Sequence, residues 1–187
     1  MRSASPVSVV GEVAVIGMFG AIGGLAAGLY DAHVQGQREA AFDAVMKKNN
    51  FAPADVLNKT LTQQLQAEGY VVTTESVTRP TADFLPSYPA APGPLLDVVL
   101  ANEGYLTQGS PAAYQPVVEL KYKLVGTGGT VLAEGAFQYS NFKGDQQPDP
   151  AYNYPDYGSL SVNPALAIKG QTSVLTQATA SVALALK

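Results

Sequence analysis

The chain has 187 residues, a formal net charge of −4, a single histidine and no cysteine. This length is typical of one domain, and 47% hydrophobic against 14% charged residues excludes a disordered chain. The 11 lysines and arginines are scattered, so no basic face for nucleic acid is expected, and the lack of cysteine excludes disulfides, thiol catalysis and Cys-ligated metals.

The first predicted element is a mostly buried strand over residues 7–17, which are rich in β-branched side chains. A glycine-rich segment follows at 17–30. Gly20, Gly24 and Gly28 are spaced four apart, so on a helix they would form a smooth stripe for close self-association or membrane contact. The alternative is a tightly packed or flexible connection between the strand and the next helix.

The same segment also resembles a dinucleotide-binding turn, because Gly17, Gly20 and Gly23 follow a strand. That site requires a second parallel strand about thirty residues on, ending in an acidic residue. Two predicted helices occupy residues 34–68, where that strand would have to lie, and the later strands are predicted to form a meander. Nucleotide binding is therefore the least favoured alternative.

Two helices are predicted next. Residues 34–48 are amphipathic, and a second helix follows Pro53, with Leu57, Leu61 and Leu65 repeating every four residues. Gly69 is a candidate left-handed cap, and a strand follows at 70–74.

The second half of the chain contains strands and two irregular loops. Residues 84–94 and 141–160 are predicted loops rich in proline and tyrosine, and residues 95–100 form an apolar run expected to be a strand buried on both faces. Residues 117–125 alternate and predict a hairpin with residues 131–139. Their inward-facing side chains are expected to be Val118, Leu120, Tyr122 and Leu124.

A final helix is predicted from Asn163-Pro164 to the C-terminus. The element order is β-α-α-β-β-β-β-α. It indicates a single α+β domain over 1–187, with one mixed or antiparallel sheet of about five strands and helices packed on it.

Catalytic and metal sites are not predicted. His33 has no orienting partner or nucleophile in evident reach, so we expect a solvated side chain rather than a general base. Asp145, Asp149 and Asp156 offer oxygen ligands, but their spacing does not match the twelve-residue calcium loop. We therefore expect no enzyme activity, no cofactor and no metal.

The tyrosines of the two loops are the preferred interaction candidates. Tyr88 lies in the first loop, and Tyr152, Tyr154 and Tyr157 lie in the second. Tyrosine offers a large contact area at low entropic cost, which favours protein contacts. The alternative is that these rings pack against their own sheet.

The order of elements in the second part of the chain resembles that of a known group of proteins. It consists of the helix Leu57–Leu65, which ends in Glu68-Gly69 and enters the strand Tyr70-Val71-Val72, and then the strand Leu96-Asp97-Val98-Val99-Leu100-Ala101, a charged hairpin and a C-terminal helix. In element order, residues 50–187 are similar to the amino-terminal domain of TolB and to envelope lipoproteins of the CsgG and neisserial surface types. The resemblance implies a non-catalytic periplasmic module, often tethered to the outer membrane, that works inside a larger assembly. This sequence departs from the pattern because it has no cysteine for a lipid anchor and adds the glycine-rich segment.

The sequence therefore predicts a protein-binding or scaffolding module of the Gram-negative periplasm or outer membrane, whose partners are envelope proteins contacted through the Tyr/Pro loops or sheet edges. The alternative is an oligomeric, membrane-associated component that uses the stripe of Gly20, Gly24 and Gly28.

Overall fold

The computed structural model describes residues 6–13, 29–75, 82–88, 90–107, 113–139 and 149–187. The elements are β1 (Pro6–Val13), α1 (Leu29–Lys48), α2 (Pro53–Ala67), β2 (Val71–Glu75), β3 (Leu95–Leu106), β4 (Gln115–Val125), β5 (Val131–Tyr139), the 3₁₀ helix η1 (Pro150–Tyr152), α3 (Tyr157–Val162) and α4 (Pro164–Ala185).

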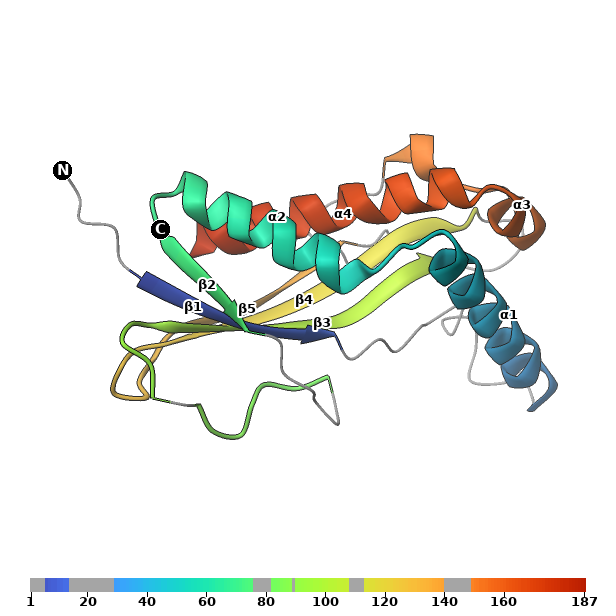
Figure 1. The fold of residues 1–187 in the computed structure, drawn as a ribbon. Coiled ribbons are helices and arrows are strands. Elements are labelled where there is room, and N and C mark those ends of the chain that lie inside the picture. The colour runs from blue at the N-terminus through green and yellow to red at the C-terminus, as the bar shows by residue number, and fades with distance from the viewer. Residues whose placement is uncertain (1–5, 14–28, 76–81, 89, 108–112, 140–148) are drawn as a thin grey trace.

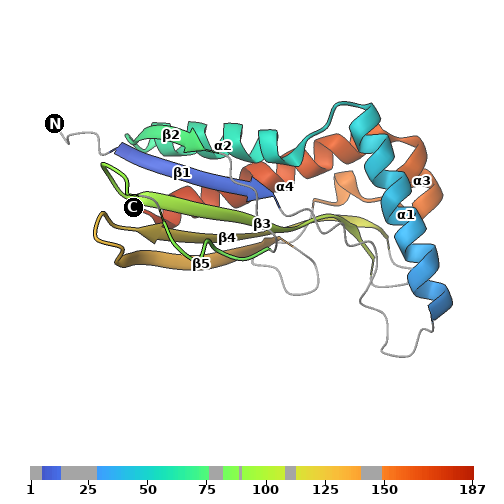
Figure 2. The same ribbon diagram turned by 60° about the horizontal axis from the view of Figure 1, so that its bottom comes forward.

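The strands form one sheet in the order β2-β1-β3-β4-β5. Helices α2 and α4 lie on one face, and α1 lies beyond one end of the sheet (Figures 1 and 2). This arrangement confirms the predicted α+β class with helices packed on a sheet. The expected meander holds for β3, β4 and β5, which pair antiparallel, but β1 pairs in parallel with both β2 and β3.

Helix α2 forms as its sequence predicts. Pro53 occupies the first turn, and Leu57, Leu61 and Leu65 are buried against the core. Gly69 follows the helix at a φ of +90°, a conformation that a side chain disfavours. The chain then turns directly into β2.

Helix α4 covers β4 and lies beside α2. The side chain of Asn163 accepts a hydrogen bond from the amide of Leu166, as expected for the residue before a first-turn proline. Gly170 allows the close approach of α4 to the sheet, because a Cβ atom at this position would lie 2.2 Å from the hydroxyl oxygen of Tyr105.

Strand β3 is twice as long as the predicted segment at 95–100 and contains a β-bulge. The pairing with β4 shifts register between Leu100 and Asn102. Leu100 lies opposite Leu120 and Glu103 opposite Val118, both on the helix-covered face. The extra residue therefore brings Glu103 onto the same face as Leu100, where simple alternation would have turned it away.

The face of the sheet opposite α2 and α4, here called the second face, is crossed by part of the first predicted loop (Figure 1). We call residues 82–88 the strap. The second predicted loop contains two short helices, η1 and α3, that the sequence reading did not anticipate. Both begin at aspartates: the side chain of Asp149 accepts from the amide of Ala151, and that of Asp156 accepts from the amide of Ser159.

Candidate functional site

Two buried acids on β3 are the most unusual polar residues in the described chain. Asp97 is 0% exposed and Glu103 is 9% exposed. The bulge between them places Asp97 on the second face and Glu103 on the helix-covered face. Because charged groups are rarely buried without a partner, each acid requires its own explanation.

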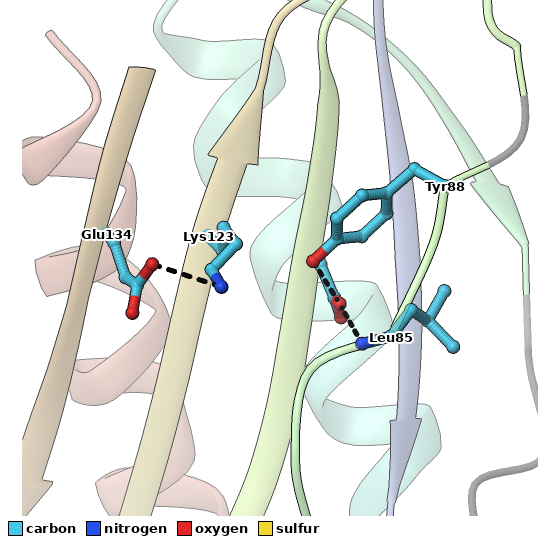
Figure 3. Close-up of polar contacts among 5 residues, drawn as sticks. Leu85, Tyr88, Lys123 and Glu134 are labelled. Atoms are coloured by element: carbon cyan, nitrogen blue, oxygen red, sulfur yellow. Dashed lines mark hydrogen bonds and ion pairs between the residues drawn. The ribbon is translucent and has the colours of Figure 1, made fainter. Parts of the chain in front are cut away.

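Asp97 binds the strap. Its carboxylate Oδ2 accepts a hydrogen bond from the amide of Leu85 at 2.9 Å and one from the hydroxyl of Tyr88 at 3.0 Å (Figure 3). Hydrogen bonds to an ionised acceptor are about twice as strong as neutral ones. Asp97 therefore binds the strap at two points, Leu85 and Tyr88.

Two lysines of β4 contact the rest of the strap. Lys121 Nζ donates to the carbonyl of Ala82 at 3.2 Å and lies 3.8 Å from the carboxylate of Asp83. Lys123 Nζ lies 4.3 Å from the centroid of the Phe84 ring, within the range of a cation–π interaction. The second face thus carries a polar and charged surface under the strap.

Lys123 belongs to a row of in-register residues on the second face. Asp97 on β3 pairs with Lys123 on β4, which pairs with Glu134 on β5. Lys123 Nζ lies 3.1 Å from Glu134 Oε2 (Figure 3). The sign of the charge therefore alternates from the middle of the sheet to its edge.

Glu103 has a different environment at the far end of β3. Burial, together with the smaller effect of the negative charge of Asp43 on α1, raises the pKa of its carboxyl to about 7. Burial also raises the pKa of Asp43, which Lys47 partly opposes. Among the described residues, no hydrogen bond or ion pair reaches the Glu103 carboxyl.

Aromatic rings surround this end of the sheet. Tyr105 is fully buried and makes edge-on contacts with Phe42 at 6.0 Å and with Tyr154 at 5.5 Å between ring centroids. Its hydroxyl donates to the carbonyl of Ala167 at 3.4 Å, and burial raises its pKa. These rings connect β3 with α1 and with the segment before α4 at the end of the sheet where Glu103 lies.

Helix α1 is attached here through Arg38. Its guanidinium lies 5.1 Å from the ring centroid of Tyr157, and Nη1 donates to the hydroxyl of Tyr114 at 3.5 Å. The Tyr157 hydroxyl in turn donates to the carbonyl of Arg38 at 3.0 Å.

The four tyrosines expected to contact partners lie in two separate places. Tyr88 is half-buried on the strap. The other three lie near α1 and α4, where Tyr152 is beside Gly170, Tyr154 bonds to Asn163 and Tyr157 bonds to Arg38. Tyr154 is 2% exposed, and its hydroxyl donates to the carbonyl of Asn163 at 2.5 Å. Its ring therefore packs inside the domain, while Tyr152 and Tyr157 remain partly exposed.

Several other candidate residues fall outside the described part of the chain or take structural roles. Gly20, Gly24, Gly28 and Asp145 lie outside the described residues, and His33 lies within α1, where its side chain is not described. Asp149 and Asp156 serve as helix caps, and the hydrogen bond from the amide of Ser159 lowers the pKa of Asp156.

The described residues contain no cluster of three or more metal-ligating side chains of His, Cys, Asp or Glu. No helix within these same ranges is long and apolar enough to cross a membrane.

The two outer strands of the sheet are the remaining candidate binding surface. β5 has nine residues, with Val131 50% and Leu132 57% exposed. β2 has five residues, with Val71 56% exposed. Each pairs with one neighbour in the described sheet, so β2 and β5 are its two edge strands.

Comparison with known proteins gives little further information. No family model matches the chain, and no curated protein matches it. Among solved structures, it is similar to protein XCC0632 from Xanthomonas campestris, of family DUF330, with 13% identity, 71% of this chain and 62% of that chain covered, and a TM-score of 0.38. A structure described as an uncharacterized protein matches with 13% identity, 98% and 94% coverage and a TM-score of 0.38. The chain thus spans less than two thirds of the Xanthomonas protein, and neither similarity identifies the fold or the function.

Proposed function

We propose that this chain is a non-catalytic protein-binding module of a larger assembly, and that a strand of a partner protein docks on the outer edge of β5. Strand addition is a common mode of peptide recognition, in which backbone hydrogen bonds supply affinity and alternate side chains supply specificity.

The length and composition of the edge strand β5 are the observation that carries this proposal. Proteins commonly protect edge strands with prolines, lysines or a short length. β5 runs for nine residues, Val131–Tyr139, and contains neither proline nor lysine. The other edge strand, β2, is only five residues long and offers fewer backbone groups.

The envelope location is a further part of the proposal. It rests on the resemblance in element order to the TolB amino-terminal domain and the CsgG-type lipoproteins. We expect the protein to fractionate with periplasmic or outer-membrane markers, and co-fractionation with a cytosolic marker would refute this location.

A pair of matched substitutions tests the docking edge. Leu132→Lys places a charge on the β5 edge, and Val71→Lys places one on the β2 edge at nearly the same exposure, 57% and 56%. Both positions are superficial, so each variant should keep its free energy of unfolding within about 0.5 kcal/mol.

The readout is the set of proteins that cross-link to the chain in intact cells, quantified for each variant. We expect Leu132→Lys to lose partners that Val71→Lys retains. Equal retention by both variants would contradict docking on β5. Light scattering of the purified protein tests the alternative of self-association through Gly20, Gly24 and Gly28.

A further inference from the structure

We propose that the segment docking on β5 is an extended stretch of a different protein that carries a lysine or arginine opposite Glu134 and a large apolar or aromatic residue opposite Gly135. This inference rests on the proposed function and specifies its partner.

The first argument is the charge row on the second face. Asp97, Lys123 and Glu134 lie side by side on three adjacent strands with alternating charge. A sixth strand would place its own residue beside Glu134, whose side chain is 49% exposed. Like charges directly opposite each other destabilise a sheet, whereas opposite charges stabilise it. The position facing Glu134 therefore selects a basic residue.

The second argument comes from the next row, on the helix-covered face. Gly135 pairs with Tyr122, and a Cβ atom at position 135 would lie 2.6 Å from the Tyr122 hydroxyl oxygen. The tyrosine ring thus occupies the place where a side chain of residue 135 would stand. A large side chain on the docking strand opposite Gly135 can pack on this ring, as aromatic residues do beside glycines at sheet edges.

Pairing of β5 with β5 of a second copy does not meet these requirements. β5 contains no lysine or arginine, so no register of β5 against β5 places a basic residue opposite Glu134. The net charge of −4 also opposes association of two identical chains. The occupant is therefore a different, locally basic segment.

The test uses three synthetic nine-residue peptides that differ only at a central position, which is Lys, Gln or Glu. Each is titrated into uniformly ¹⁵N-labelled protein while amide shifts are followed. We expect the largest shifts on β5, with the Lys peptide binding about two- to fivefold more tightly than the Gln peptide and the Glu peptide binding most weakly.

Charge reversal provides the decisive comparison. Glu134→Lys should reverse the order of the peptides, and Glu134→Gln should remove the preference without reversing it. Glu75→Lys, on the exposed edge strand β2, is the matched control and should leave the order unchanged.

The outcomes separate this inference from the proposed function. Shifts on β5 without any charge preference, or with a preference that Glu134→Lys does not reverse, would overturn the basic-partner inference and leave strand docking intact. If no peptide perturbed β5, both the inference and the proposed docking edge would be overturned.

Discussion

Asp97 and Glu103 lie on the same strand and are both buried, yet their surroundings differ. The carboxylate of Asp97 receives two hydrogen bonds from the strap. Glu103 lies near a second acid, Asp43, and its pKa is raised to about 7. The comparison shows that the cost of burying an acid depends on the donors that meet it rather than on burial alone.

The two acids should therefore respond in opposite ways to removal of their charge. Asp97 stabilises the fold through the acceptor oxygen that binds the strap. Glu103 is favoured in its neutral form and makes the ionised protein less stable. Three measurements of the free energy of unfolding test this difference.

The largest effect is expected for Asp97→Ala. This change leaves the amide of Leu85 and the hydroxyl of Tyr88 without their acceptor, at a cost of about 4 kcal/mol for two hydrogen bonds to a charged group. Urea denaturation measures the loss. The control is Asp83→Ala, whose side chain is 74% exposed and should cost less than about 0.5 kcal/mol. Similar losses for both variants would show that Asp97 does not anchor the strap.

The next effect is the pH dependence caused by Glu103. Its pKa is higher in the folded protein than its ordinary value of 4.5, so the folded state binds the proton more tightly. The resulting stabilisation is fully present below about pH 4.5 and is lost as the pH rises towards 7. We expect a decrease on the order of 3 kcal/mol across this window. The raised pKa of Asp43 acts in the same direction.

Glu103→Gln is the matched variant for this measurement, because glutamine resembles the neutral acid. Denaturation at about pH 5 and about pH 8 should show little change at the lower pH and a more stable protein at the higher pH. A wild-type stability that is flat across this range, or a variant with an undiminished slope, would refute the assignment to Glu103.

The smallest expected effect is the difference in stability between losing a hydrogen bond to a carboxylate and losing one to a backbone carbonyl. Tyr88→Phe removes a hydrogen bond to the Asp97 carboxylate, and Tyr70→Phe removes one to the carbonyl of Leu186 at 2.7 Å. We expect Tyr88→Phe to cost about 1 kcal/mol more, since bonds to ionised groups contribute more. Equal losses in thermal denaturation would argue that the Asp97 bonds are weak.

Much of the core was predictable because it follows simple periodicity. Leu57, Leu61 and Leu65 are buried as their spacing predicts. Val118 and Leu120 are also buried and face the helices as the alternation of β4 predicts. In these elements, the local pattern and the tertiary packing agree.

The sequence reading missed the features that depend on irregular or distant contacts. Asn102-Glu103-Gly104 disfavours a strand, and Gly104 has a φ of +132°, so the extension of β3 through the bulge had no local signal. The role of Asp97 depends on the strap, which approaches it only in the folded chain. The only sign of this role in the sequence was the position of Asp97 within the apolar run 95–100. The caps at Asp149 and Asp156 were also missed, because residues 141–160 were predicted to be a loop and these acids were considered only as metal ligands.

The bulge in β3 has a consequence for comparing this protein with distant relatives. One added residue moves the side chain of every later residue of the strand to the opposite face of the sheet. A relative without that residue must carry its buried acid and tyrosine one position earlier to reach the same face. Sequence alignments across β3 should therefore place a single-residue gap at Ala101, and substitutions that look radical without the gap become conservative once it is introduced.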